Sequence, residues 1–247
     1  MTNAVLHHGD ALAVLPTLPV GAADVVITDP PYNSGGRTSS ERLTQSARDK
    51  YVSTTGKGGA NHDLADFVGD NRDQRSYGYW LSLVLAECHR VTGPGGIACV
   101  FTDWRQLPAT SDALQAAGWT WRGIVAWQKP NNRPRLGGFR QSTEYIVWGT
   151  HGALLADRNP VCLPGLLTGS QPQGSKRVHI TQKPVDVLRE LVKVCPPGGT
   201  VLDPFAGSGS TGVAALAEDR GFLGVELSDH YHAVAAQRLG FSPAPHP

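Results

Sequence analysis

The chain has 247 residues, of which 40% are hydrophobic and 17% are charged, and this composition excludes a largely disordered protein. The formal net charge is only +1, so the overall charge does not by itself indicate a nucleic-acid-binding protein. We expect one cytoplasmic domain over residues 1–247 with no membrane partner, because no stretch approaches the roughly 20 consecutive apolar residues of a membrane span and the N-terminal sequence lacks a signal-peptide pattern. The four cysteines lack CxxC spacing, which argues against zinc ribbons and thioredoxin motifs, and no metal site is expected.

Short β-branched or aromatic segments alternate with amphipathic ones along the chain. Several of the strand candidates lack alternation, which is typical of strands buried on both faces of a mostly parallel sheet. The interleaving predicts a three-layer α/β fold with helices on both faces of the sheet. The expected strands are 4–8, 24–28, 96–101, 123–127, 144–149, 200–203 and 222–226. The expected helices are 77–91, 184–195, 209–218 and 229–239, the last with Ser228 as its N-cap.

Two regions, 33–75 and 152–178, do not fit this alternation. Loops of such length in a compact domain are usually functional or disordered. Basic charge gathers in segment 33–60, which contains five basic and two acidic residues, and in segment 127–142, which contains four basic residues and no acid. These stretches supply candidates for phosphate contacts, with solvated surface loops as the alternative. The candidates are Arg37, Arg42, Lys129, Arg133, Arg135 and Arg140.

The tetrapeptide DPPY, Asp29 to Tyr32, directly follows the strand 24–28. Ligands of open α/β sheets bind beyond the carboxyl ends of the strands, so this turn is placed at a binding edge. The two prolines remove two backbone donors, and what remains is a carboxylate, carbonyl acceptors and an aromatic ring. Such a turn suits a planar group with an exocyclic amine, whose two protons the carboxylate and a proline carbonyl can accept while the ring stacks on Tyr32.

The segment DPFAGSGSTG, residues 203–212, lies between an expected strand and an expected helix. Its glycines match the GxGxxG fingerprint, and Glu226 stands 23 residues beyond Asp203, where it could hold ribose hydroxyls. Only 35 residues follow Gly212, too few for the second half of a dinucleotide fold. A single-nucleoside cofactor therefore fits better than NAD, and Asp203 offers a carboxylate to a cationic or ammonium-bearing ligand.

With both motifs in this order, the sequence resembles the β group of the amino-methylating, S-adenosylmethionine-dependent DNA methyltransferases. Similar blocks follow one another along nearly the whole chain, at 7–33, at 89–103, in IVAWQKPNNRP, in STEYIVWGTHG and at 179–192. The resemblance implies a Rossmann-like seven-stranded methyltransferase sheet with the catalytic motif before the cofactor motif. It also implies S-adenosyl-L-methionine as cofactor and a base flipped out of double-stranded DNA.

The resemblance assigns roles to individual residues. Asp29, Pro30, Pro31 and Tyr32 are expected to shape the catalytic turn and to grip and stack the target base. Glu226 is expected on the cofactor ribose, Asp10 on its adenine, and Gln182 and Lys183 near its methionine end, while the role of His179 stays open. The full expected cofactor set is Asp10, Ala11, Asp29, Gln182, Lys183, Asp203, Phe205, Ala206, Gly207, Ser208, Gly209, Ser210, Thr211 and Glu226.

An aspartate at the head of DPPY resembles the adenine-N6 type, whereas serine is usual in the cytosine-N4 type, which stays the alternative. An RNA or protein-glutamine substrate, an NAD-dependent Rossmann dehydrogenase and a non-catalytic DNA-binding module are more remote alternatives. Segment 33–75 is expected to be a mobile insertion that flanks the base and DNA, and 152–178 a short target-recognition segment. A homodimer and a cognate restriction endonuclease, as in restriction-modification systems, are compatible partners.

Overall fold

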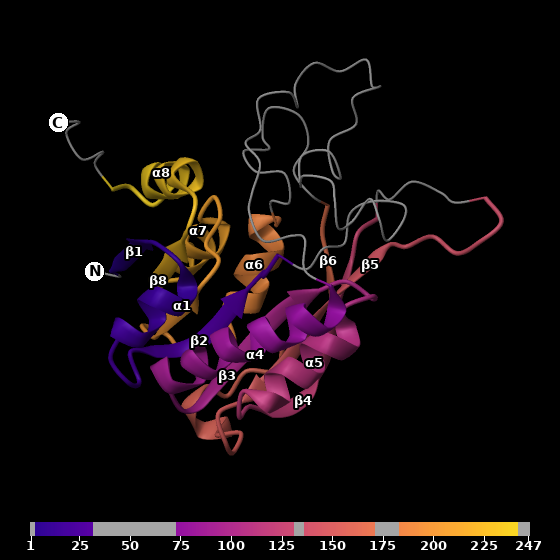
Figure 1. Cartoon of the computed structure of the whole chain (residues 1–247), viewed down its shortest axis with the longest axis horizontal. Helices are drawn as coiled ribbons and strands as arrows, with labels where there is room; N and C mark the ends of the chain where they lie inside the picture. Colours follow the sequence, from indigo (N-terminus) through magenta and orange to yellow (C-terminus); the bar gives the residue numbers. More distant parts are fainter. Residues whose placement is uncertain (1–2, 32–72, 131–135, 171–182, 242–247) are drawn as a thin grey trace, which may run out of the picture.

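A computed structural model describes residues 3–31, 73–130, 136–170 and 183–241. These residues form an eight-stranded mixed sheet with the order β1-β8-β7-β2-β3-β5-β4-β6, covered by helices on both faces (Figure 1). The strands are β1 Ala4–His8, β2 Ala23–Thr28, β3 Thr92–Thr102, β4 Thr120–Gln128, β5 Thr143–Thr150, β6 Leu166–Thr168, β7 Thr200–Asp203 and β8 Gly221–Glu226. The helices are α1 Ala11–Val14, α4 Gln74–Val91, α5 Leu107–Ala116, α6 Val185–Val192, α7 Ser210–Ala217 and α8 Asp229–Arg238, with short 3₁₀ turns η1 Leu15–Thr17 and η2 Ala156–Arg158.

All seven expected strands and all four expected helices form, and the Rossmann-like architecture is confirmed. The sheet has one more strand than expected, because Leu166–Thr168 pairs in parallel with the end of β4. Three residues carry no readable periodicity, so only this pairing makes them a strand. Helix α5 was not predicted either; it buries Ala113 and Leu114 against the same face as α4.

The strands alternate between two cores, which explains why their sequences are almost continuously apolar. In β2, Val26 packs into the core under α1, α4 and α5, whereas Val25 and Ile27 pack into the core under α6 and α7. Helix α4 is capped at Asp73, whose side chain accepts a hydrogen bond from the Ser76 amide at 2.8 Å. Each large apolar side chain buried in these cores contributes about 1.5–3 kcal/mol.

One strand runs against the others. β5 is antiparallel to both β3 and β4, between which it lies, and every other pairing in the described sheet is parallel. The amino end of β5 therefore lies at the edge of the sheet where the parallel strands have their carboxyl ends. For this reason residues 143–145 come close to the turn that follows β2, although more than 100 residues separate them in sequence.

The described part of segment 152–178 is divided between the two edges of the sheet. Arg158 of η2 pairs with Asp24 at the start of β2, and Asn159 donates hydrogen bonds to the carbonyls of Lys193 and Val194, both at 2.9 Å. Strand β6 then leads the chain back to the carboxyl edge. Within the described ranges, none of the helices is long and apolar enough to cross a membrane.

Candidate active site

Four adjacent strands, β1, β8, β7 and β2, end at one edge of the sheet, and their ends are joined by hydrogen bonds. The Gly9 amide after β1 donates to the Glu226 carbonyl at 2.9 Å. The Thr28 hydroxyl at the end of β2 donates to Asp203 Oδ1 at the end of β7, at 2.8 Å. The topology thus brings Asp10, Glu226, the glycine motif and Asp29 together, as the sequence predicts.

The glycine motif turns sharply into α7. Gly207 has φ 53° and Gly209 has φ 78°, a left-handed backbone region that favours glycine. A Cβ on Gly209 would also lie 3.1 Å from the Cβ of Ala235 in α8. Both the backbone conformation and the close approach of α8 therefore require glycine at position 209.

An arginine that the sequence did not single out holds this loop in place. Arg238, in the last turn of α8, donates from Nη1 to the Ser208 carbonyl at 2.5 Å and to the hydroxyls of Ser208 and Ser210 at 3.0 and 3.2 Å. No motif contains Arg238, and its position near the end of a helix is ordinary for a basic residue. Only the packing of α8 on the loop reveals its contact.

Glu226 also contacts the glycine motif, through a hydrogen bond from its backbone. Its Oε2 accepts from the Gly207 amide at 2.7 Å and its Oε1 accepts from the Ser228 amide at 2.8 Å. Burial raises the pKa of Glu226, and these amide hydrogen bonds oppose the rise. A carboxylate has about four acceptor sites, so Glu226 retains capacity for hydroxyl donors such as those of a ribose. Asp10, exposed beside it, caps α1 by accepting from the Leu12 amide at 2.8 Å.

Asp203 is almost fully buried between the two motifs. Besides the Thr28 hydroxyl, its Oδ1 accepts from the Phe205 amide at 3.1 Å. Burial raises the pKa of Asp203 to about 6, with a further contribution from the charge of Asp29, while hydrogen bonds from Thr211, Thr28 and Phe205 oppose the rise. In this structure, Asp203 links the end of β7 to the end of β2 through its hydrogen bond with Thr28.

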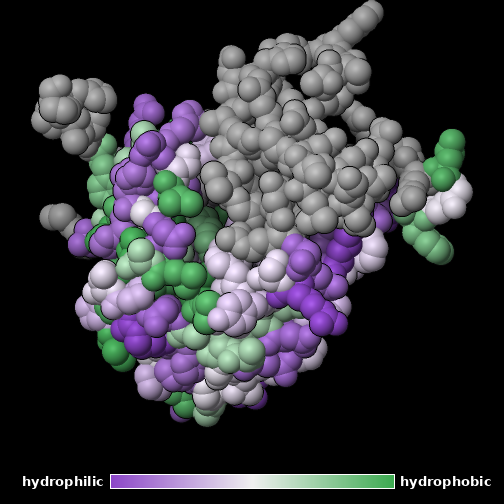
Figure 2. Space-filling model, viewed as in Figure 1, coloured by the Kyte–Doolittle hydropathy of each residue, from purple (hydrophilic) through white to green (hydrophobic). Residues whose placement is uncertain are grey.

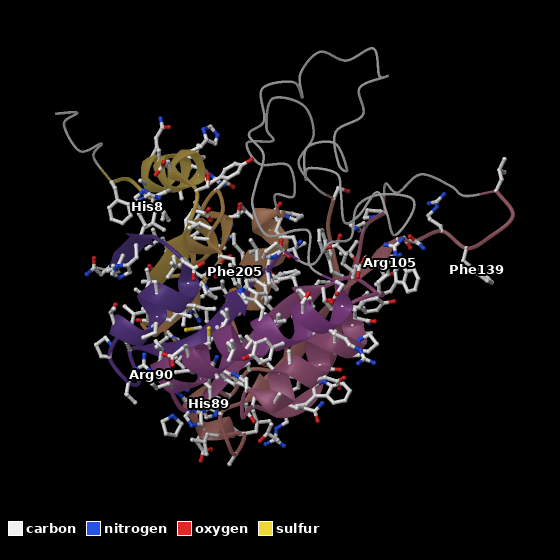
Figure 3. The ribbon with its side chains drawn as sticks, in the orientation of Figure 1. His8, His89, Arg90, Arg105, Phe139 and Phe205 are labelled. Carbon is white, nitrogen blue, oxygen red and sulfur yellow. The ribbon has the colours of Figure 1, made fainter. Side chains whose placement is uncertain are left out.

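Phe205 carries an aromatic ring toward the middle of this edge (Figure 3). The ring is half-buried and lies 5.3 Å from the Trp80 ring of α4, measured between centroids. Two aromatic rings at an offset, tilted approach stabilise one another by about 0.5–1.5 kcal/mol. The contact fixes Phe205 as an apolar wall beside the glycine motif, where a nucleoside base can pack.

The catalytic turn begins at Asp29, whose side chain is 22% exposed. Lys183, two residues before the start of α6, donates from Nζ to Asp29 Oδ2 at 2.6 Å. Pro30 is buried and Pro31 is half-buried, so the turn packs against the body of the protein. The contact with Asp29 brings Lys183 to the catalytic turn.

Lys183 is 5% exposed and has a second carboxylate nearby. Glu144 Oε2, at the start of β5, lies 3.4 Å from its Nζ, and the other oxygen of Glu144 pairs with Lys129 at the end of β4. Burial alone would lower the pKa of Lys183, but the charges of Asp29 and Glu144 outweigh it and hold the pKa above its usual value. Burial alone would raise the pKa of Glu144, and Lys183 and Lys129 outweigh this in turn, so that the pKa is lowered.

Sequence reasoning missed Glu144, which it treated only as part of a strand. The available signal was an acidic residue at the head of an otherwise buried apolar segment, EYIVWG. Acidic residues are almost never buried unless they are paired, so a partner could have been expected. Which partner it would be depends on the antiparallel insertion of β5.

The connection between β4 and β5 projects from the same edge. Its described part, residues 129–130 and 136–142, includes Leu136 and Phe139, which are 99% and 95% exposed, and the exposed Arg140. Figure 2 shows apolar side chains standing clear of the body of the protein at this place, and Figure 3 labels Phe139 there.

Several expected site residues lie outside the described residues, and no contact can be assigned to them. They are Tyr32, Arg37, Arg42, Arg133, Arg135 and Gln182. Of the expected insertion 33–75, only residues 73–75 are described, and they form the cap and first turn of α4.

The chain matches the DNA methylase family over residues 23–154 and 163–237. It is also 31% identical over 234 residues to YubD of Escherichia coli (strain K12), whose name describes it as a methylase; the alignment covers 94% of this chain and 88% of YubD. The chain belongs to the amino-methylating, S-adenosylmethionine-dependent DNA methyltransferases. The resemblance read from DPPY and DPFAGSGSTG is thereby confirmed, together with the cofactor that it implies.

Named relatives of this methyltransferase include M2.LlaDCHI of Lactococcus lactis subsp. cremoris, a type II methyltransferase. It is 29% identical over 262 residues, covering 96% of this chain and 89% of the relative. The M1.HpyAVI–SAM complex shares the fold at a TM-score of 0.67 and 23% identity, covering 96% of this chain and 100% of that one. The cytosine-N4-specific PvuII DNA methyltransferase shares it at a TM-score of 0.68 and 16% identity, covering 99% and 89%.

The glycine motif, Glu226 and Phe205 fit S-adenosylmethionine. The left-handed glycine turn lets backbone approach the ligand closely, Glu226 can accept from ribose hydroxyls, and Phe205 offers an apolar wall. The carboxyl groups of Asp29 and Asp203 lie at the edge where a sulfonium or ammonium cation would lie, and negative charge there would attract it. The nucleoside end of the cofactor is thus best accommodated near β1 and β8, and its methionine end toward β2.

Proposed function

We propose that this methyltransferase transfers a methyl group to the N6 amine of adenine in double-stranded DNA, after the base has been flipped out of the duplex. The observation that carries the proposal is the Thr28–Asp203 hydrogen bond, which places the Asp29 carboxylate next to the glycine motif. Acceptor and cofactor loop thus share one edge, as a direct transfer between two bound molecules requires.

The proposed chemistry uses few groups. The lone pair of the target amine is delocalised into its ring, which makes the amine a poor nucleophile. Asp29 and a proline carbonyl of the turn accept hydrogen bonds from the amine, draw it toward tetrahedral geometry and localise the lone pair. Bound S-adenosylmethionine supplies an electrophilic methyl group. The polar acceptors then offset the positive charge that builds on the nitrogen, and the product loses its proton to Asp29 or to water.

Base flipping is part of the proposal because the amine of a paired base cannot reach the Asp29 carboxylate, which is only 22% exposed at the edge of the sheet. Extrusion costs a few kcal/mol of unpairing and unstacking. Stacking on Tyr32, which lies outside the described residues, would offset part of this cost.

For DNA, we propose contacts from the β4–β5 connection, where Arg140 is exposed, and from the chain that follows β6. This is narrower than segment 152–178 as a whole, because Arg158 and Asn159 are engaged at the opposite edge of the sheet. The basic residues Arg37, Arg42, Arg133 and Arg135 keep their proposed phosphate role. Lys129 is less suited to it, because its ammonium is paired with Glu144 and its side chain is only 18% exposed.

Adenine is preferred over cytosine on the identity of residue 29, since an aspartate there resembles the adenine type. The fold does not distinguish the two bases, because a cytosine-N4 enzyme shares it. The test is to incubate the purified protein with unmethylated DNA and labelled S-adenosylmethionine and to analyse the nucleosides by mass spectrometry. N6-methyladenine is the expected product; N4-methylcytosine would overturn the choice of base, and unmodified DNA would overturn the proposed function.

A further inference from the structure

Four charged side chains of alternating sign stand in a row at the catalytic turn. The row begins at Asp29, whose Oδ2 accepts from Lys183 at 2.6 Å. It continues from Lys183 to Glu144 Oε2 at 3.4 Å and ends with Lys129 on the other oxygen of Glu144. The four residues follow β2, precede α6, begin β5 and follow β4, so no local sequence pattern brings them together.

The interior of the row is shielded from water. The Lys183 side chain is 5% exposed and that of Glu144 is 12% exposed. The Lys183 ammonium also lies 5.2 Å from the centroid of the Phe101 ring and 5.7 Å from that of Trp127, at cation–π distance. In such surroundings charges interact strongly, and an ammonium that loses its only carboxylate is strongly destabilised.

One carboxylate would be enough to neutralise Lys183, yet the structure gives it two. The second one matters when Asp29 is engaged by another donor. If Asp29 turns toward a target amine, its hydrogen bond to Lys183 weakens, and Glu144 keeps the buried ammonium compensated. While Lys183 is still bound to Asp29, Lys129 pairs with Glu144 and compensates its negative charge.

We propose that Glu144 is a positioning residue for methyl transfer, which shares Lys183 with Asp29 and so sets how firmly the lysine holds the catalytic carboxylate. The inference rests on the proposed role of Asp29 as acceptor of the target amine. Glu144 does not touch the base in this scheme; it acts through Lys183.

Replacing Glu144 by glutamine changes the charge and hardly the shape. Lys183 then no longer shares its ammonium between Glu144 and Asp29, so its hydrogen bond to Asp29 strengthens and makes that carboxylate a weaker acceptor. The loss of one negative charge nearby also lowers the proton affinity of Asp29. Among the described residues, the charged groups that bear on Asp29 include Lys183 and Asp203 directly, and Glu144 and Lys129 through the lysine.

The experiment compares the wild-type protein with Glu144→Gln and Glu144→Asp. Single-turnover methyl transfer to DNA is measured at saturating S-adenosylmethionine and DNA across a range of pH, and cofactor affinity is measured by calorimetry. We expect Glu144→Gln to slow transfer about tenfold at neutral pH and to move the acid limb of the pH profile to lower pH. Cofactor affinity should stay within about twofold. Glu144→Asp, which keeps the charge, should retain most of the wild-type pH profile.

A matched control is Glu190→Gln, because Glu190 pairs with Lys193 on the exposed side of α6 and is itself half exposed. It should change neither the rate nor the pH profile. A Glu144→Gln enzyme with the wild-type rate and pH profile would overturn the inference. So would a loss of rate fully explained by a loss of cofactor affinity, which would make Glu144 part of the cofactor site.

A second readout does not need activity. The carboxyl carbon of Asp29 can be followed by ¹³C NMR during a pH titration, with Asp29→Asn used to assign the signal. We expect a lower titration midpoint in Glu144→Gln than in the wild type, and an unchanged midpoint contradicts the inference. If the wild-type protein methylates no DNA, the proposed function fails, while this titration still decides whether Glu144 acts on Asp29.

Discussion

The Thr28 hydroxyl donates a hydrogen bond of 2.8 Å to Asp203 Oδ1, across 175 residues of sequence. Thr28 is the last residue of β2 and directly precedes DPPY, whereas Asp203 is the last residue of β7 and the first of DPFAGSGSTG. The bond therefore ties the turn that begins at Asp29 to the glycine motif. Both side chains are almost fully buried, so solvent does not compete for it.

Replacing Thr28 by valine should loosen this connection. Valine has a similar shape, but it leaves a buried carboxyl oxygen with one donor fewer, which costs about 1–3 kcal/mol. We expect a lower midpoint of chemical unfolding and a slower methyl transfer. Thr28→Ser, which restores the hydroxyl, should recover most of the transfer rate; equal rates in Thr28→Val and the wild type would show that the bond does not set the geometry.

The ionisation of Asp203 should make stability depend on pH. Its folded-state pKa of about 6 lies above the usual value of 3.8, so the folded state binds more protons than the unfolded state between these values. The contribution of Asp203 to the free energy of unfolding is therefore largest below the usual pKa and falls as pH rises through about 6. In Asp203→Asn this component disappears, and the stability difference between variant and wild type should change across that window. The free energy of unfolding of both proteins is measured with urea at several pH values. If the difference between Asp203→Asn and the wild type is the same from acid to neutral pH, the prediction is wrong.

Asp29→Ala should abolish methyl transfer and leave cofactor binding nearly intact. The carboxylate is the proposed acceptor of the target amine, whereas most of the contacts expected with the cofactor come from the glycine motif and Glu226. Transfer is measured with labelled cofactor, and binding is measured by calorimetry. Activity within tenfold of the wild type, which corresponds to about 1.4 kcal/mol in the barrier, would refute the role.

Glu226→Ala should chiefly weaken the binding of S-adenosylmethionine. A charge-assisted hydrogen bond to a ribose hydroxyl contributes about 1.5–3 kcal/mol, or a tenfold to 150-fold change in affinity. The variant also leaves the Gly207 and Ser228 amides without their carboxylate, so Glu226→Gln is the matched control that keeps an acceptor there. Unchanged affinity of Glu226→Ala in calorimetry would leave Glu226 with a structural role only.

Arg140→Ala should weaken binding to DNA of any sequence. A lost phosphate contact lowers the slope of log affinity against log salt by about 0.9. The matched control is Arg122→Ala, since Arg122 bonds Thr150 and the Gly152 carbonyl at the opposite edge of the sheet. Loss of affinity for one sequence alone would mean that Arg140 reads bases, and an unchanged slope would leave it as solvated surface.

Much of the fold could be predicted from the sequence because its strands are buried on both faces. Segments such as DVVIT and TVLD have an apolar centre between polar residues at both ends, so their boundaries are marked by composition. The two motifs could be paired for the same reason: each follows such a strand, and parallel strands share one carboxyl edge. Helix α5 and strand β6 escaped prediction because their form depends on the neighbours on which they pack.

The sequence by itself determined seven of the eight described strands, the two motifs and the family. Only the tertiary structure decided that Glu144 and Lys129 stand behind Lys183 and Asp29, and that Arg238 holds the glycine motif. The physical reason is the antiparallel placement of β5 between β3 and β4, which brings the start of β5 to the carboxyl edge. Local sequence encodes burial and turns, but the partner of a buried charge is chosen by how distant strands are ordered in the sheet.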